Sequence, residues 1–223
     1  MAGLAVALAT GCSATRSLEP LEAGTGAITA SFGGPINNDL GAAIPLPYSS
    51  IGYMHGLNGK TNVYGAFYPS GLLIFGVPGI DLGVSTEVLE PDGARPRIMV
   101  DGVVYAFAGN NAEGDPPFGA RVWLDGASTF VWPIKDHALF TSVDLFVQPG
   151  PEFNAYLNPH IGGRLRWGRF GFQLEYTWWG PWVNTQYMQP EWKGPGGFGA
   201  STVQLGLDIR LGPKKEKLSL IHI

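Results

Sequence analysis

Apolar and polar residues alternate along most of this chain, and the segment RFGFQLEYTWW at residues 169–179 shows the pattern most clearly. Successive side chains of a β-strand point to opposite sides, so each face collects every second residue. One face carries Phe170, Phe172, Leu174, Tyr176 and Trp178, and the other carries Arg169, Gly171, Gln173, Glu175 and Thr177. This period of two predicts a β-strand with one apolar and one polar face.

The same alternation recurs in about ten segments, each bounded by Gly, Pro, Asn or Asp. Strands of about ten residues are long enough to cross a bilayer when tilted. The sequence PSGLLIFGVPG at residues 69–79 is expected to form a short helical turn or a loop dipping into the membrane interface. The predicted strands span residues 25–33, 47–57, 60–69, 79–90, 96–108, 118–132, 138–149, 155–167, 169–180 and 199–211.

Charge composition indicates which face meets water. Charged residues make up 14% of the chain, against about 25% in soluble domains. Lysines fall mainly at turns and in the tail, while many other charges alternate within strands and mix signs. This favours a polar barrel interior in which buried charges must be paired. The expected interior charge network comprises Asp81, Glu87, Asp101, Arg121, Asp125, Asp144, His160, Arg164, Arg166, Arg169, Glu175, Asp208 and Arg210.

Connection lengths alternate in the same sense. NGK, PDGAR, PIKD and GR are tight, whereas the intervening connections are longer, up to GPWVNTQYMQPEWKGPGGFG. Outer-membrane barrels have short periplasmic turns and longer extracellular loops. With that orientation, aromatic girdles are predicted at the two membrane interfaces. Trp132 and Trp167 would lie at the periplasmic rim, and Trp178, Trp179 and Trp182 at the outer rim.

Taken together, residues 24–211 resemble bacterial outer-membrane β-barrels. The resemblance is to a fold type and not to one family, so it assigns no functional residues. It implies an all-β, antiparallel up-and-down transmembrane barrel of about ten strands, with eight as the alternative count, in the bacterial outer membrane and in contact with its lipids. The rival architecture is a lipid-anchored, soluble, lipocalin-like barrel whose apolar face lines a ligand cavity.

Both ends of the chain are expected to lie outside the barrel. Leu8, Ala9, Thr10 and Gly11 before Cys12 resemble a bacterial lipobox, in which Cys12 would become the lipid-bearing N-terminus; an ordinary signal peptide with a free cysteine is the alternative. We expect a signal segment at 1–12, a periplasmic linker at 13–23 and a polar tail at 212–217. Residues 218–223, LSLIHI, match the in-frame translation of a common transposon-library adapter, and we expect them to be foreign to the fold.

Several functional classes have little support. A formal net charge of -4 offers no basic surface for nucleic acid. The single cysteine excludes an internal disulfide framework and a zinc site of the CxxC type. Barrels of about this strand number are filled by side chains, which argues against a wide pore. The sequence calls for no cofactor or metal.

Four roles remain open at this level. The first is a purely structural role. In the second, the barrel conducts a small solute, preferably an anion, along Arg164, Arg166, Arg169 and Arg210. In the third, an outer loop that includes Tyr187 and Trp192 captures an unidentified surface ligand. A lipid-acting barrel enzyme is the fourth. It would need a histidine base; we expect His55 and His137 to be poorly placed, and His160 to point inward near Asp144 as a hydrogen-bonded filler. Ser142 is the neighbouring hydroxyl, but no catalytic residue is assigned.

Overall fold

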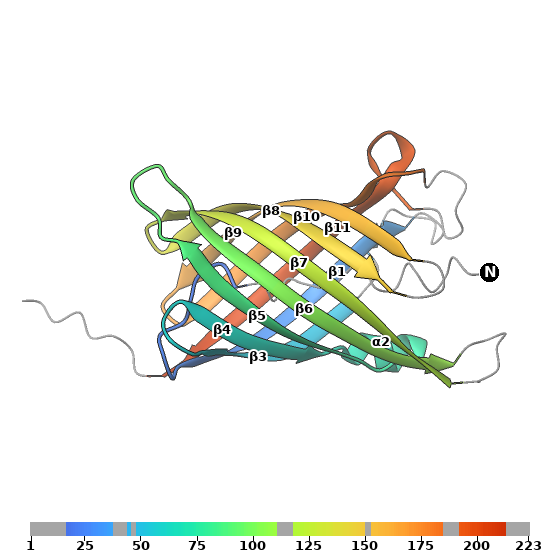
Figure 1. Ribbon diagram of the computed structural model, residues 1–223, viewed down its shortest axis with the longest axis horizontal. Coiled ribbons are helices and arrows are strands. Elements are labelled where there is room, and N and C mark those ends of the chain that lie inside the picture. Colours follow the sequence, from blue (N-terminus) through green and yellow to red (C-terminus); the bar gives the residue numbers. More distant parts are fainter. Residues whose placement is uncertain are drawn as a thin grey trace, which may run out of the picture.

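A computed structural model describes residues 17–37, 44–45, 48–110, 118–149, 153–184 and 192–212. Within them one antiparallel sheet follows chain order, and the pairing of its last strand with its first closes it into a barrel of ten long strands (Figure 1). The two-residue β2 only extends the end of β1. The strands are β1 (Gly26–Asn37), β2 (Ile44–Pro45), β3 (Tyr48–Gly56), β4 (Thr61–Phe67), β5 (Gly79–Leu89), β6 (Arg97–Asn110), β7 (Phe118–Ile134), β8 (His137–Gln148), β9 (Asn154–Trp167), β10 (Phe170–Asn184) and β11 (Phe198–Leu211). The predicted up-and-down barrel and its strand count are confirmed.

The apolar faces of the strands point outward. On β10, Phe172 and Leu174 are 40% and 51% exposed, while Gln173 and Glu175 between them are 5% and 1% exposed. The same division holds along β5, β9 and β11. A surface belt of large apolar side chains around a polar interior is the arrangement of an outer-membrane-type barrel. The lipocalin-like alternative, which needs the apolar face inside, is therefore wrong.

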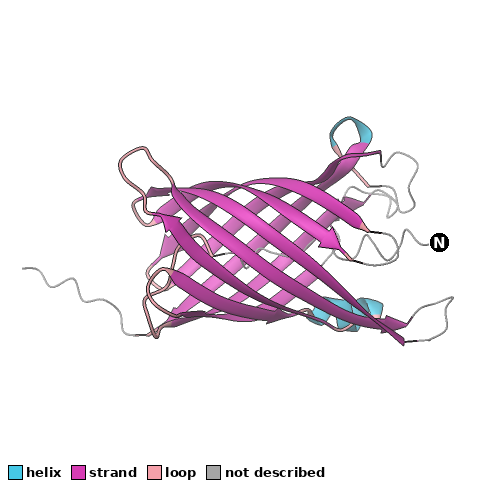
Figure 2. Ribbon diagram, in the orientation of Figure 1, coloured by secondary structure: helices cyan, strands magenta, loops and turns pink. Residues whose placement is uncertain are grey.

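The connections divide between the two ends of the barrel. Turns of two to four residues join β3 to β4, β7 to β8 and β9 to β10, and with the seven-residue connection from β5 to β6 they lie at one end, which we call the tight-turn end (Figure 2). The remaining connections, from β1 to β3, β4 to β5, β6 to β7, β8 to β9 and β10 to β11, lie at the opposite, loop end. One of them contains the helix α2 (Pro69–Phe75), as predicted for PSGLLIFGVPG, and Gly76 ends it in the left-handed conformation at φ 66°. In the described part of the chain, no helix is long and apolar enough to cross a membrane.

Aromatic side chains fill the lumen toward the loop end. Tyr48 contacts Tyr68, with ring centroids 5.3 Å apart, and the series continues through Phe107, Trp123 and Phe146. A second buried group at this end joins Trp179, Trp192 and Ala200, with Tyr156 packed against it. These rings close off much of the space between the walls.

The chain before β1 enters the lumen at the tight-turn end. Residues 17–21, which we call the plug segment, fall within the linker predicted at 13–23, and in the structure they lie inside the barrel. Leu18 is 1% exposed and packs with Val131 and Phe140, and Leu21 is 6% exposed. Burial of these two leucines explains why the segment lies inside the barrel and not in water.

Candidate functional site

The tight-turn end of the lumen carries a row of charges across three strands. Gly171 on β10 is paired with Arg166 on β9 and with Asp208 on β11. Arg166 Nη2 donates to both carboxylate oxygens of Asp208, at 2.8 and 3.1 Å. A Cβ atom at residue 171 would lie 2.0 Å from Asp208 Oδ1. Glycine in the middle of the row is therefore what gives the carboxylate room to reach Arg166.

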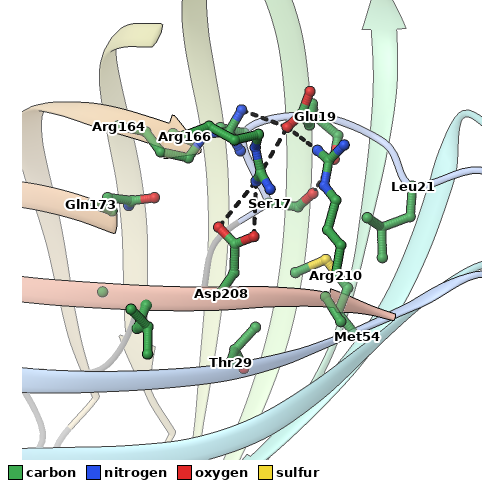
Figure 3. Close-up of a pocket in the computed structure, with 14 residues that line it drawn as sticks. Ser17, Glu19, Leu21, Thr29, Met54, Arg164, Arg166, Gln173, Asp208 and Arg210 are labelled. Atoms are coloured by element: carbon green, nitrogen blue, oxygen red, sulfur yellow. Dashed lines mark hydrogen bonds and ion pairs between the residues drawn. The ribbon is translucent and has the colours of Figure 1, made fainter. Parts of the chain in front are cut away.

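Glu19 of the plug segment completes this cluster (Figure 3). Its Oε1 accepts a hydrogen bond from Arg164 Nη2 at 2.6 Å, pairs with Arg166 Nη2 at 3.4 Å and accepts from Arg210 Nη2. Burial raises the pKa of Glu19, but the charges of Arg164, Arg210 and Arg166 outweigh it, so that the pKa lies below its ordinary value. The plug segment is thus tied to β9 and β11 by a charged carboxylate.

Asn62 of β4 holds the backbone of the plug segment from the opposite wall. Its side chain is fully buried; Oδ1 accepts from the Leu21 amide at 2.8 Å, and Nδ2 donates to Ser17 Oγ at 2.7 Å and to the Glu19 carbonyl at 3.2 Å. Arg97, which pairs with Glu87 at 2.5 Å, adds a hydrogen bond to the Leu18 carbonyl at 3.5 Å. These contacts satisfy polar backbone groups that burial would otherwise leave unpaired.

His160 forms a second centre at mid-barrel. Its Nε2 lies 2.6 Å from Asp144 Oδ2 and its Nδ1 lies 2.5 Å from Glu175 Oε1, with Thr177 Oγ1 2.8 Å from the same Nδ1. The ring is 6% exposed. Both ring nitrogens are held by acidic groups, so this histidine cross-links β8, β9 and β10 and offers no nitrogen to a substrate. Ser142, on the neighbouring strand, bonds to Thr129 and to the Ser128 carbonyl.

Three buried aspartates line the wall made by β5, β6 and β7, and each faces a tyrosine. Tyr68 donates to Asp81, Tyr64 OH lies 3.5 Å from Asp101 Oδ1, and Tyr105 OH lies 3.5 Å from Asp125 Oδ2. Among the described residues, no group of three or more His, Cys, Asp or Glu side chains is arranged to hold a metal ion.

Two arginines expected in the interior network lie outside it. Arg169 is exposed in the two-residue turn between β9 and β10. Its backbone carbonyl accepts a hydrogen bond from the Arg210 amide at 2.9 Å. Arg121 is exposed near the loop end of β7. Both sit at the ends of strands, where a long side chain reaches water even if its position has inward parity.

The aromatic residues divide by strand parity. Trp132, Trp167 and Trp182 are 38%, 61% and 53% exposed on the outer surface, and Trp178 is half-buried. Trp179, also predicted for the outer girdle, points into the lumen instead, because it follows Trp178 and adjacent residues of a strand face opposite sides.

The residues predicted for the outer loop and for lipidation have different outcomes. Trp192 is 9% exposed and packs with Trp179, so it is a buried lumen residue and not a surface contact. Tyr187 and Cys12 lie outside the described residues. His55 is half-buried on β3 and stacks on Tyr53, and His137 begins β8, where its Nδ1 accepts from the Arg166 amide at 3.2 Å.

The sequence did not single out Glu19, Asn62 or Arg97. A lone asparagine in a strand and a glutamate in a segment without periodicity carry no signal of their own. The usable clue for Glu19 was the surplus of arginines at the same end of β9 and β11, which predicts an acidic partner from elsewhere in the chain.

Comparison with known proteins assigns this chain to no family. No family model matches the sequence, and no curated protein matches it either. Among solved structures, the chain is similar to the translocator domain of autotransporter NalP from Neisseria meningitidis, with a TM-score of 0.44 and 10% identity over 87% of this chain and 91% of that chain. The barrel assignment rests on this chain's own strand pairing and on the burial of its two faces.

Proposed function

We propose that this protein resides in the bacterial outer membrane as a closed barrel, a membrane scaffold whose lumen does not allow free diffusion. The observation that carries the proposal is the plug segment, which is seated in the tight-turn mouth with Glu19 bound to Arg164 and Arg210. The outward apolar belt supports the membrane location, because such a surface is stable only in lipid. By the usual orientation of these barrels, the tight-turn end faces the periplasm.

The lumen is filled at three levels. The plug segment and its arginines occupy the tight-turn end, His160 with its two acidic partners crosses the middle, and aromatic rings pack toward the loop end. A solute would have to displace each level in turn. This supports a structural role over an open pore.

Permeation of small anions after release of the plug segment is the second candidate function. It is favoured by the nature of the seal: ion pairs hold Glu19, and hydrogen bonds from Asn62 hold the backbone of the plug segment, and water can replace both kinds of contact. Once the segment leaves, the guanidinium groups of β9 and β11 would line the mouth and attract anions.

Conductance in planar bilayers tests both candidates. We expect the wild-type protein and the control variant Glu90→Ala, altered at an exposed turn of the same end, to be silent. The double variant Glu19→Ala/Asn62→Ala should either remain silent, if the deeper levels seal the lumen alone, or show anion-selective openings, if the plug segment is the gate. Discrete open channels from the wild type would contradict the closed barrel.

A further inference from the structure

A hollow lies between the plug segment and the wall of β9, β10 and β11 (Figure 3). The space inside it is about 30 Å³, and the guanidinium groups of Arg164, Arg166 and Arg210 line it together with the carboxylates of Glu19 and Asp208. Ser17, Thr29, Gln173 and Gly206 add polar and backbone groups to its lining. The hollow therefore brings most of the charge of the tight-turn end around one small space.

The charges around the hollow do not balance. Three guanidinium groups face two carboxylates, which leaves one positive charge in surplus. Arg97, the other arginine near the plug segment, is balanced by its own partner Glu87. Each of the three is paired, but all three share one carboxylate oxygen, Glu19 Oε1, and two of them, Arg164 and Arg166, are buried, so this site favours one further negative charge.

The same arginines also have hydrogen-bond donors to spare. Arg164 and Arg166 are 7% and 8% exposed. Four of the buried nitrogens have no hydrogen-bond partner in the described part of the chain: Arg164 Nε, Arg166 Nε, Arg166 Nη1 and Arg210 Nε. Within the described part of the chain, Arg166 engages Asp208 and Glu19 through Nη2 alone, so two of its three nitrogens, Nε and Nη1, have no hydrogen-bond partner. Charge surplus and spare N–H donors are independent properties, and both point to an anion.

We propose that this hollow is a binding site for one small monovalent anion of the halide class, held by the spare N–H groups of Arg166 and its neighbours while Glu19 stays in place. One unit of surplus charge matches a monovalent ion. A divalent oxyanion would over-neutralise the site and meet repulsion from Glu19 and Asp208 at close range. The apolar side chains of Leu18, Leu21 and Met54 limit the remaining space to a small ion.

Bromide is the probe for this site. Folded protein in a neutral detergent is heated in sodium bromide, exchanged stepwise for sodium gluconate at constant ionic strength, and the fraction that keeps its folded gel mobility is scored. We expect a saturable rise in the unfolding temperature with bromide. In crystals soaked with bromide, an anomalous peak should lie within hydrogen-bond distance of Arg166 Nε or Nη1.

Two variants change the surplus charge in opposite directions. Asp208→Asn raises it, so bromide should bind about tenfold tighter, whereas Arg166→Gln removes it, so the saturable effect should disappear. Arg95→Gln, at an exposed turn, is the matched control and should behave as the wild type. If Arg166→Gln fails to fold, the Asp208→Asn variant still decides, because unchanged or weaker bromide binding there overturns the proposal. A bromide effect that does not saturate, or that persists in Arg166→Gln, is a general salt effect and also overturns it.

Discussion

The side chain of Asn62 holds the plug segment in place at the tight-turn end of the barrel. One buried amide group makes three hydrogen bonds to residues 17–21, and it is the main polar contact between β4 and the plug segment. Opposite it, Glu19 supplies the charge that the arginines need. An amide on one wall and a carboxylate bound to the other thus make most of the described polar contacts that position the segment.

Replacement of Asn62 by Ala should release the plug segment without unfolding the barrel. Loss of the amide leaves buried backbone groups unpaired, at a cost of about 1–3 kcal/mol. The measurement is maleimide labelling of Ser17→Cys in a Cys12→Ser background, which should rise at least about tenfold. Lys60→Ala, at an exposed neighbouring turn, is the control. Unchanged protection of position 17 would show that Asn62 does not hold the segment.

Acid should loosen the same segment through Glu19. Because its pKa in the folded protein lies below the ordinary value of 4.5, Glu19 adds stability above that value and loses it as the pH falls through the folded pKa. Glu19→Gln should therefore be less stable than the wild type at pH 7, and the difference should shrink as the solution is acidified below pH 4.5. Urea unfolding at a series of pH values measures this difference; a gap that stays constant with pH would contradict it.

At the scale of elements, strand parity explains which side chains meet lipid. β10 places Phe170 and Leu174 on one exposed face, with Trp167 near the first of these and Trp178 beyond the second. The depth of each position along the strand sets how much apolar lipid surrounds it. The position of a residue along β10 therefore indicates its depth in the membrane.

Arginine substitutions at these two positions should differ in cost. Leu174→Arg, midway between the two tryptophan levels, should destabilise the barrel by about 2–4 kcal/mol, and Phe170→Arg, near the rim, by about 0–1 kcal/mol. Reversible unfolding from phosphatidylcholine vesicles, monitored by tryptophan fluorescence, measures both. Equal costs at the two positions would mean that the bilayer does not cover β10 as proposed.

The strands could be predicted from the sequence more accurately than the strand ends or the plug segment. Alternation in segments such as 199–211 follows directly from the two-sided environment of a barrel strand, so it could be recognised from one sequence. Trp179 was predicted on the outer surface beside Trp178, although its parity turns it inward. Arg121 was predicted inside the barrel, although it lies near the end of β7, where its long side chain reaches water. The plug segment could not be predicted, because residues 17–21 have no period and their position depends on partners far along the chain.

For the whole molecule, pairing of β11 with β1 closes the sheet, so that every long strand of the described residues has a neighbour on both sides. A closed barrel resists detergent because each backbone group of its wall is paired, whereas heat unfolds it. The unboiled protein should therefore migrate differently from the boiled protein in detergent gels, and it should partition into the detergent phase. Identical mobility together with a water-soluble product would contradict the outward apolar belt.

The position of Glu19 in the chain has a consequence for the order of assembly. Its hydrogen-bond partners Arg164 and Arg210 lie 145 and 191 residues later. The plug segment is the first described part of the chain to be synthesised, but its partners lie on strands that are synthesised last. Arg210 reaches its position only when β11 pairs with β1. Seating of the segment is thus a late event that reports completed ring closure, so a barrel lacking its final hairpin would leave the plug segment exposed to proteases.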